Sequence, residues 1–517
     1  MHTHAGHEPL PPPGPSHPRL LLGFALAKIA LHLTAITRYG YFRDELYYLA
    51  STEHLDWGYV EHPPLSIVLL AMFRFMFGDS LVALRTLPAL AGAATVVLTG
   101  MIARRLGGGR FAQGLACLAA LFAPVFLGTN HFYSMNSFDL LLWTLAVWLL
   151  LVILREATTT RWVWLGVVLG LGLLNKISVL WLGLGLGVGL LLTPHRRLLQ
   201  TGGPYLAAAV AGAMFVPHLW WQVANGWPTL EFMRNATAVK MVDVPWSDFV
   251  LKQLLEVGPG NAPVWLVGLG FGLAARAVRP FRILAWIYLS VGLLLLLGGR
   301  SRASYLAVAY PMLLALGGVA WERASAAAGS WLRVPVTALV VVSGLVTLPF
   351  ALPVLGVDAF IRYQARLGMQ PSTEEHHEVG PLPQHYADMF GWEELGALVN
   401  TAYQRLTPRE RARCRVFGQN YGEAGAIDVI GRRLGLPRAM SGHNSYWLWG
   451  PGDFDGQVLI IIGGDREDNA QFFEEIEIVG QTRNPYAMPY ERGLDVSIAR
   501  RPKGTLRAAW PMLRHFI

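Results

Sequence analysis

The chain has 517 residues, of which 53% are hydrophobic and only 15% are charged. Soluble domains carry about 25% charged residues, so this composition excludes a string of soluble domains and predicts a protein that crosses a membrane several times. The 42 Lys and Arg residues outnumber the 34 Asp and Glu residues and give a net charge of +8, which in a membrane protein is typical of basic loops on one side and does not indicate nucleic-acid binding.

Eleven apolar runs are candidates for membrane-spanning helices, which need about 20 apolar residues each. They cover residues 19–38, 82–103, 112–130, 136–154, 162–175, 177–193, 203–221, 263–278, 281–298, 303–321 and 333–354. The fifth and sixth runs are short and joined through Asn175, Lys176 and Ser178, so they are either two spans or one bent segment. Residues 1–18 are predicted to form a disordered cytoplasmic tail, because they are rich in Pro and His.

The positions of arginine and lysine predict which loops face the cytoplasm. If the N-terminus is cytoplasmic, every cytoplasmic loop is basic, and an odd number of spans leaves the C-terminal region outside. The outside segments are then 39–81, 131–135, 175–178, 222–262, 299–302 and everything after about residue 355. Residues 64–78 are apolar but contain Arg74, which favours a helix at the membrane interface over a further span.

Residues 355–517 are predicted to form a small α/β soluble domain outside the membrane. Strand-like runs at 415–421 and 458–464 alternate with helix-like runs at 422–435 and 468–480. Such alternation is typical of an α/β fold. Residues 19–354 form the transmembrane domain in this division of the chain.

Two adjacent carboxylates, Asp44 and Glu45, follow the first span and lie among aromatic residues. One interpretation is a pair of solvated acids in an interfacial aromatic belt. The other is a functional pair, since ionisable groups beside the bilayer are unfavourable unless they serve a purpose. A carboxylate at the membrane surface can act as general base for an incoming hydroxyl or amine.

Four charged residues in or beside the spans also call for an explanation. Asp139 falls about one turn inside the fourth span, where an acid is either functional or paired with a Lys or Arg of a neighbouring helix. Lys176, Arg300 and Arg302 are cations on the predicted outside face, where topology does not explain them. They are typical of a site for an anionic phosphate group, although anchoring to lipid headgroups is an equally good interpretation.

Two further patterns are discounted as sites. The glycine-rich run at 183–189 resembles a dinucleotide loop, but it lies inside an apolar span and favours close helix packing. The EEHHE run at 374–378 has metal-ligand residue types without spaced partners. No metal site is predicted, and a divalent ion remains open as a cofactor only because acid pairs sometimes hold one.

Four short motifs, taken in order, resemble glycosyltransferase family 39, which includes protein O-mannosyltransferases and the bacterial transferase that puts aminoarabinose on lipid A. The motifs are the aromatic-flanked acid pair after the first span, EHPPL at 61–65, ARRLGGGR at 103–110 and the Y-x-x-x-x-Y-P segment at 305–311. The resemblance covers about residues 19–354. It implies a GT-C fold, an α-helical polytopic membrane protein with its active site on the outer face and a polyprenyl-phosphate sugar as donor.

The resemblance also implies roles for particular residues. The family's first acid maps onto Asp44, with Glu45 beside it, as the base or the group that orients the acceptor. Its second acid often follows a Met where this chain has Asn136, so Asp139 is the expected substitute. Lipid A transferases have Lys before Pro-Pro-Leu, whereas this chain has His62. The donor phosphate is expected to contact His62, Lys176, Arg300 and Arg302.

The C-terminal segments 418–427 and 441–451 are similar to the tails of bacterial members of the family. Four of their side chains are candidate contacts for an acceptor glycan: Tyr421, Glu423, His443 and Trp447. Aromatic rings beside amides and carboxylates suit sugars, but these residues are also explained if they build the fold.

The sequence therefore predicts an inverting glycosyltransferase at the outer face of a bacterial inner membrane. It would move a monosaccharide from a polyprenyl-phosphate donor to a glycan, lipid or protein acceptor. The alternative from another class is a secondary transporter or lipid flippase, which would need paired repeats with broken helices at the midplane. A scaffold that keeps the fold without turnover is a third interpretation.

Overall fold

The computed structural model of the chain describes residues 10–517. The chain divides into two compact units, each made of separate stretches of sequence. Unit 1 takes the described residues up to Ile36 together with Arg85–Leu219 and Asp243–Val354. Unit 2 takes Thr37–Leu84, Trp220–Val242 and Leu355–Ile517.

The predicted N-terminal tail is described only in part. Residues 1–9 lie outside the described residues, and with them half of the predicted disordered segment. Residues 10–17 have no regular secondary structure, but their backbone is hydrogen-bonded within unit 1. The Gly14 amide donates to the Arg104 carbonyl at 2.8 Å, and Arg155 donates to the Pro11 carbonyl at 2.7 Å.

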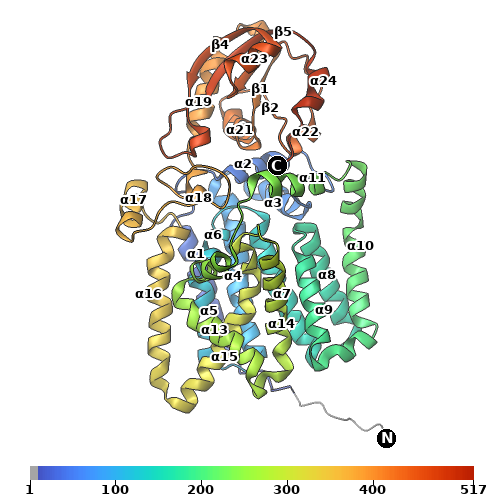
Figure 1. The fold of residues 1–517 in the computed structure, drawn as a ribbon, viewed down its shortest axis with the longest axis vertical. Coiled ribbons are helices and arrows are strands. Elements are labelled where there is room, and N and C mark those ends of the chain that lie inside the picture. Colours follow the sequence, from blue (N-terminus) through green and yellow to red (C-terminus); the bar gives the residue numbers. More distant parts are fainter. Residues whose placement is uncertain (1–9) are drawn as a thin grey trace. The chain divides into compact units, whose positions relative to one another are not determined.

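Unit 1 is helical, and Figure 1 shows its long helices as roughly parallel ribbons. Its α-helices are α1 (Pro18–Leu33), α4 (Leu81–Arg105), α5 (Arg110–Phe122), α6 (Pro124–Thr129), α7 (Met135–Arg155), α8 (Thr159–Asn175), α9 (Val179–Leu191), α10 (Gly203–Ala224), α12 (Trp246–Val257), α13 (Ala262–Ala274), α14 (Arg282–Leu297), α15 (Tyr310–Ala328) and α16 (Arg333–Ala351). Short turns join them at η1 (Pro194–Gln200), η3 (Pro259–Asn261), η4 (Arg276–Phe281), η5 (Ala303–Ala309) and η6 (Ser330–Leu332).

Every one of the eleven predicted apolar runs contains a helix, and the protein is a multi-pass membrane protein. Within the described residues, six helical stretches are long and apolar enough to cross a bilayer, and a seventh results if α9 and η1, bent by 111°, form one broken span. The other runs form helices of 13 to 17 residues, namely α1, α5, α8 and α13. The predicted number of eleven spans is therefore not confirmed.

Glycines let neighbouring helices of unit 1 approach closely. A Cβ atom on Gly189 of α9 would lie 2.7 Å from Ile283 of α14, and one on Gly185 would lie 3.0 Å from Ile287. Side chains at these positions would push the two helices apart. The glycine-rich run at 183–189 is thus a helix-packing surface, as predicted.

The ARRLGGGR segment at 103–110 joins α4 to α5 and is held by a carboxylate. Glu322 of α15 accepts hydrogen bonds from the first backbone amides of α5, which have no partner inside that helix. The donors are Gly109 at 2.6 Å, Phe111 at 3.1 Å and Ala112 at 3.1 Å. This part of the family motif therefore has a structural role in unit 1.

Unit 2 combines short helices with a sheet. Its helices are α2 (Arg43–Ser51), α3 (Leu65–Phe77), α11 (Pro228–Asn235), η2 (Ala236–Lys240), α17 (Val357–Arg366), α18 (Gln384–Ala387), α19 (Trp392–Arg405), α20 (Pro408–Ala412), α21 (Tyr421–Ala426), η7 (Ile427–Gly431), α22 (Ser445–Trp449), α23 (Arg466–Phe472), η8 (Pro489–Glu491), α24 (Leu506–Ala509) and η9 (Trp510–Leu513). Its strands are β1 (Cys414–Gly418), β2 (Ala439–Met440), β3 (Val458–Ile462), β4 (Phe473–Gln481) and β5 (Asp495–Pro502).

The five strands form one mixed sheet in the order β2-β1-β3-β5-β4. Strand β1 is parallel to β2 and β3, so that Val416 lies opposite both Ala439 and Ile460, and β5 is antiparallel to β3 and β4. All five residues of β3 are buried, as expected for a central strand covered on both faces. The predicted α/β domain is confirmed, with a sheet of its own.

One predicted element of this domain is wrong in part. The run at 468–480 was expected to be helical, but only its first residues belong to α23, and Phe473–Gln481 form β4. The glutamates of β4 made this run look helical in the sequence. They are exposed on an edge strand and are paired with arginines of the neighbouring strand. Glu475 lies opposite Arg500 in the register, and charged residues on an edge strand protect it from further pairing.

Unit 2 assembles three segments that the charge rule placed on one side of the membrane: 39–81, residues 222–242 of the predicted 222–262 segment, and the region after 355. Segments that pack into one compact unit lie on the same side of a bilayer. An even number of crossings must therefore separate each segment from the next, which agrees with six predicted spans between the first pair and four between the second.

Candidate active site

Helix α21 packs directly on α2, and glycines permit the contact. A Cβ atom on Gly425 would lie 3.0 Å from the Leu46 carbonyl carbon, and one on Gly422 would lie 2.5 Å from Arg43 Cγ. Both glycines belong to the 418–427 segment singled out in the sequence. Their lack of side chains brings Tyr421, the first residue of α21, against the first turn of α2.

Asp44 is fixed by this contact and still reaches solvent. The Tyr421 hydroxyl donates a hydrogen bond to Asp44 Oδ1 at 2.9 Å, and Arg43 Nε lies 3.8 Å from the same oxygen. The Asp44 side chain is 36% exposed. One carboxylate oxygen is thus held in place, and the group remains open to an incoming hydroxyl, as a general base requires.

Glu45 has a different environment from its neighbour. It is fully buried and accepts a hydrogen bond from the Phe42 amide at 2.8 Å. This bond satisfies a backbone donor at the start of α2 and stabilises the helix terminus. Of the two adjacent acids, Asp44 faces the accessible surface and Glu45 holds the helix.

Arg43 lies between Asp44 and the buried carboxylate of Asp388. Its guanidinium lies 3.8 Å from Asp388 Oδ1 and 5.3 Å from the centre of the Tyr421 ring. Asp388 also accepts a hydrogen bond from the Tyr490 hydroxyl at 3.2 Å. Burial raises the pKa of Asp388 to about 6, although Arg43 opposes the rise.

Glu61 forms a third carboxylate centre close to Asp44. It accepts a hydrogen bond from the Tyr47 hydroxyl at 2.8 Å and another from the Asn444 side chain. Burial raises the pKa of Glu61 to about 7, with a smaller contribution from the negative charge of Asp44. Tyr47 also packs against Tyr421, with 4.8 Å between the ring centres. The tyrosine that binds Glu61 is therefore in contact with the tyrosine that binds Asp44.

His62, a predicted phosphate contact, is buried between aromatic rings in unit 2. Its ring centre lies 4.9 Å from that of Tyr48 and 5.1 Å from that of Tyr59. Its Nδ1 atom is 3.0 Å from the Pro63 carbonyl oxygen. The ring therefore packs the EHPPL turn against α2, and its exposed fraction is 2%.

Glu423, predicted as an acceptor contact, is one of two buried carboxylates joined by an amide. Asn420 donates hydrogen bonds to Glu423 at 2.9 Å and to Glu491 at 3.0 Å. Burial raises the pKa of Glu423 well above its usual range and that of Glu491 to about 7. Burial therefore favours the protonated form of both carboxyl groups.

The other two predicted acceptor contacts are part of the packing of unit 2. His443 is buried, its ring packs on Tyr421, and burial lowers its pKa to about 3, so that it stays neutral. Trp447 and Trp510 donate their indole N–H groups to each other's carbonyl oxygens at 2.9 and 3.1 Å. Of the four candidates, Tyr421 is the one in contact with Asp44.

Asp139 and Lys176, the acid and the lysine that the sequence singled out in unit 1, form an ion pair. Lys176 Nζ lies 3.7 Å from Asp139 Oδ2 and donates to Asn136 Oδ1 at 2.7 Å. Ser178 Oγ lies 2.8 Å from each Asp139 oxygen, and Lys176 is 5.3 Å from the centre of the Tyr305 ring. Asp139 is therefore paired with a cation of a neighbouring segment, the simpler of its two interpretations, and it positions Lys176 in the process.

The two arginines of the short 299–302 connection have different surroundings. Arg300 Nε lies 2.6 Å from Asp243 Oδ1 in an ion pair at the surface. Arg302 is half-buried and near enough to Lys176 for their positive charges to repel. The structure thus groups Arg302, but not the exposed Arg300 pair, with Lys176.

The sequence predicts no metal site but leaves a divalent ion open as a cofactor. Among residues 10–517, no group of three or more His, Cys, Asp or Glu side chains is arranged to hold a metal ion. In the EEHHE run, Glu375 forms an ion pair with Lys240 at 3.4 Å, and His377 lies 3.9 Å from Glu375. The run therefore joins two segments of unit 2.

Sequence reasoning missed three members of the Asp44 surroundings: Arg43, Glu61 and Asp388. Glu61 carried a signal, since it opens the EHPPL motif next to His62. Arg43 precedes the acid pair directly, but arginine beside acids is common at membrane surfaces. Asp388 had no signal, because nothing in the sequence relates it to α2.

Two sequence comparisons bear on this arrangement. Residues 61–221 match the model of the dolichyl-phosphate-mannose-protein mannosyltransferase family. Lipid A galacturonosyltransferase RgtD of Rhizobium johnstonii is 26% identical over 294 residues, which are 55% of this chain and 60% of that protein. The chain thus spans about three fifths of the length of this curated relative.

Solved structures extend the likeness to nearly the whole fold. ArnT from Cupriavidus metallidurans matches with a TM-score of 0.58 when bound to undecaprenyl phosphate and 0.59 in the apo state, at 17% identity over 93% of this chain and 97% of that one. The oligosaccharyltransferase AglB from Archaeoglobus fulgidus, in complex with an inhibitory peptide and a dolichol-phosphate, matches with a TM-score of 0.50 at 11% identity over 86% of this chain and 69% of that one.

These likenesses define a polytopic membrane protein with the GT-C fold. A C-terminal α/β region with its own sheet accompanies the membrane helices. The resemblance to glycosyltransferase family 39 is thus supported by the match over residues 61–221 and by the shared fold.

Proposed function

We propose that the protein is an inverting glycosyltransferase that uses a polyprenyl-phosphate-linked monosaccharide as donor. The acceptor is a glycan or glycolipid at the outer face of a bacterial inner membrane. The names of the matched proteins support this class of reaction, since RgtD is a lipid A galacturonosyltransferase and ArnT binds undecaprenyl phosphate.

The observation that carries the proposal is the state of Asp44. It is a half-exposed carboxylate oriented by the Tyr421 hydroxyl and by Arg43, on the first helix after the first apolar run. The carboxylates around it, Glu61 and Asp388, have raised pKa values and hold their protons more tightly. An accessible carboxylate in such surroundings is suited to accept a proton.

In the proposed reaction the acceptor hydroxyl attacks the anomeric carbon of the donor. A new C–O bond forms there, the bond from the anomeric carbon to the phosphate oxygen breaks, and the hydroxyl proton passes to Asp44. The departing polyprenyl phosphate gains negative charge. Lys176 and Arg302 are the proposed counter-charges for it, since cations aimed at a developing charge stabilise the transition state.

The proposed location follows from the charge rule. Unit 2, with Asp44, lies outside the cytoplasm, and the N-terminus lies inside, because the arginine-rich loops are then cytoplasmic. A reporter fusion would test this: alkaline phosphatase fused after residue 517 should be active only when it is exported. An inactive fusion that is nevertheless stably inserted would contradict the proposed side.

The reaction is tested with purified protein in nanodiscs, undecaprenyl-phosphate sugars and envelope lipids, with transfer followed by mass spectrometry. We expect one hexose, pentose or uronic acid unit to be added to an acceptor. Asp44→Asn should reduce kcat by a factor of about 10² to 10⁴, the usual contribution of a general base, without loss of membrane insertion.

The matched control is Asp453→Asn, a change of an exposed acid in a loop of unit 2, which should leave transfer unchanged. Undiminished transfer by Asp44→Asn would remove Asp44 from the mechanism. A flippase would instead move labelled lipid between leaflets without forming a glycosidic bond. Repeating the assay with the protein in vesicles in place of nanodiscs distinguishes the two activities.

A further inference from the structure

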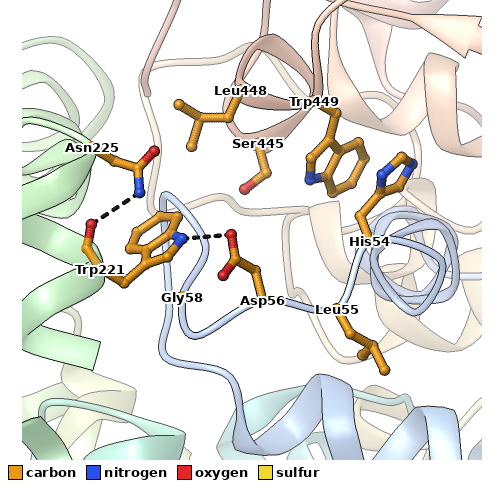
Figure 2. A pocket seen from close by; sticks show the side chains of 9 residues that line it. All are labelled: His54, Leu55, Asp56, Gly58, Trp221, Asn225, Ser445, Leu448 and Trp449. Atoms are coloured by element: carbon orange, nitrogen blue, oxygen red, sulfur yellow. Dashed lines mark hydrogen bonds between the residues drawn. The ribbon is translucent and has the colours of Figure 1, made fainter. Parts of the chain in front are cut away.

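Unit 2 contains a polar hollow of about 260 Å³ beside α22 and the loop that follows α2. Figure 2 shows its lining, with Trp221 and Asn225 on one side and Trp449 and His54 on the other. Asp56 and Ser445 project between them. The volume is slightly below the roughly 300–1,000 Å³ typical of small-molecule sites, a size suited to a single sugar ring.

The aromatic walls of the hollow are rigid. The rings of His54 and Trp449 stack at 4.3 Å with 9° between their planes. The Trp221 indole is 7% exposed and donates a hydrogen bond to Asp56 Oδ2 at 2.7 Å. Aromatic side chains held in this way offer apolar surface to the C–H face of a sugar without loss of side-chain entropy on binding.

Hydrogen-bonding capacity remains at the centre of the hollow. Asp56 is exposed, and its two oxygens have about four acceptor positions. The Trp221 indole and the Trp57 amide take one each, at 2.7 Å. Asn225 donates to the Trp221 carbonyl at 2.9 Å, which directs its amide oxygen elsewhere. Ser445 Oγ accepts from the Val60 amide at 3.1 Å and keeps its proton to donate.

The hollow is connected to Asp44 through two aromatic side chains, first Tyr47 and then Tyr421. The Tyr47 ring centre lies 6.0 Å from that of Trp449 and 4.8 Å from that of Tyr421. The Tyr47 hydroxyl accepts a hydrogen bond from the Ser445 amide at 3.3 Å and donates to Glu61. Tyr421 in turn donates to Asp44. Two aromatic residues thus separate the hollow from the proposed base.

We propose that this hollow is an acceptor subsite that binds one sugar ring next to the ring whose hydroxyl receives the transferred sugar. The inference rests on the proposed glycosyl transfer. It specifies a sugar with hydroxyl or amino groups and no acid group, because the central side chain is the Asp56 carboxylate and a carboxylate repels an anionic sugar. The hollow therefore contributes to acceptor choice, whereas the donor phosphate requires cations.

The first measurement is binding, independent of turnover. Full-length protein in detergent is titrated with methyl glucoside, glucosamine and galacturonic acid, and contacts are followed by saturation-transfer NMR. We expect millimolar binding of the first two and at least tenfold weaker binding of the acid. Asp56→Asn and Asn225→Ala should each weaken binding about tenfold, the effect of losing one or two sugar hydrogen bonds. Asp44→Asn should bind as the wild type does.

The second measurement is steady-state transfer by the same variants. Asp56→Asn and Asn225→Ala should raise the acceptor KM about tenfold and leave the donor KM unchanged. A raised donor KM instead would assign the hollow to the donor sugar and overturn the acceptor subsite. Unaltered binding and KM in both variants, with unchanged melting temperatures, would overturn the subsite altogether.

The two proposals fail in different ways. Sugar binding that depends on Asp56, in a protein that transfers nothing, would support the hollow as a sugar site and contradict the glycosyl transfer. Transfer that requires Asp44 but ignores Asp56 and Asn225 would support the reaction and contradict the hollow. Equal binding of the acidic sugar would contradict the charge argument.

Discussion

Units 1 and 2 each hold a predicted catalytic acid, and the two acids have opposite surroundings. Asp139 in unit 1 has an exposed fraction of 2% and faces Lys176 and Ser178. Asp44 in unit 2 is 36% exposed and is held by a neutral hydroxyl and an arginine that it shares with Asp388.

This difference follows from where each acid lies. An acid inside a membrane span must have a partner, because an unpaired charge in hydrocarbon is strongly unfavourable, so Asp139 is matched by a lysine. An acid in a water-exposed unit has no such requirement and can keep an oxygen open to substrate. The comparison favours Asp44 over Asp139 as the proposed base, and it leaves Asp139 as the ion-pair partner of Lys176.

The largest effect is expected from breaking the unit 1 pair. Lys176→Met leaves Asp139 buried beside Ser178 without its cation, and removal of one partner of a buried pair destabilises by about 3–5 kcal/mol. Thermal unfolding of the purified protein in detergent measures the loss. The double variant Lys176→Met with Asp139→Asn should regain most of the stability, since no uncompensated charge remains.

A single Lys176→Met variant that melts like the wild type would contradict this account of Asp139. The double variant also addresses function. If Lys176 pairs with the donor phosphate, the stable double variant should still show a donor KM raised at least tenfold.

The fold was largely predictable from the sequence, because apolar runs report directly on helices. Residues 183–189 were predicted to pack helices and do so against Ile283 and Ile287. Strand β4 was not predicted, because its glutamates mask the alternation of an edge strand. The assembly of unit 2 from three distant segments was predictable only as a shared side of the membrane.

The candidate site was predictable as a set of residues but not as a geometry. Asp44 and Tyr421 were both singled out, one as a base and one as an acceptor contact, and the hydrogen bond between them joins residues 377 positions apart. The sequence has no local signal for such a bond. Glu45 and Asp44 looked equivalent as neighbours, and the structure separates them by burial, by the capping bond of Glu45 to Phe42 and by the bond of Asp44 to Tyr421.

A smaller effect is expected in unit 2, on the pH dependence of its stability. Burial raises the pKa of Glu61 from 4.5 to about 7. Between these pH values the unfolded chain releases the Glu61 proton while the folded chain keeps it, so a rise in pH favours unfolding. The stability from Glu61 is fully present below about pH 4.5 and is lost as the pH rises through 7. Melting temperatures at pH 5 and pH 8 should reveal the fall.

In Glu61→Gln, the loss of stability with rising pH should be smaller by on the order of 2 kcal/mol. One pKa unit corresponds to about 1.4 kcal/mol, and Glu61 is only partly buried. Glu474→Gln, a change of an exposed acid on β4, is the matched control and should leave the profile as it is. A Glu61→Gln protein with the wild-type pH dependence would show that this carboxyl does not hold its proton to neutral pH.

The smallest effect is expected for the hydroxyl that holds Asp44. Tyr421→Phe keeps the ring against Tyr47 but removes the hydrogen bond to Asp44. A hydrogen bond of this kind contributes about 1 kcal/mol, so kcat should fall about fivefold with both KM values unchanged. The shift should be confined to kcat, with the melting temperature unchanged.

That shift separates a positioning role from a merely structural one. A Tyr421→Phe change that only loosened the contact between α21 and α2 would lower the melting temperature together with kcat. Tyr403→Phe on α19 removes a hydroxyl elsewhere in unit 2 and should alter neither quantity. The contrast with unit 1 then becomes quantitative: Asp139 depends on its partner for several kcal/mol because it is buried in the helices, whereas Asp44 depends on its partner for about one because water already stabilises its charge.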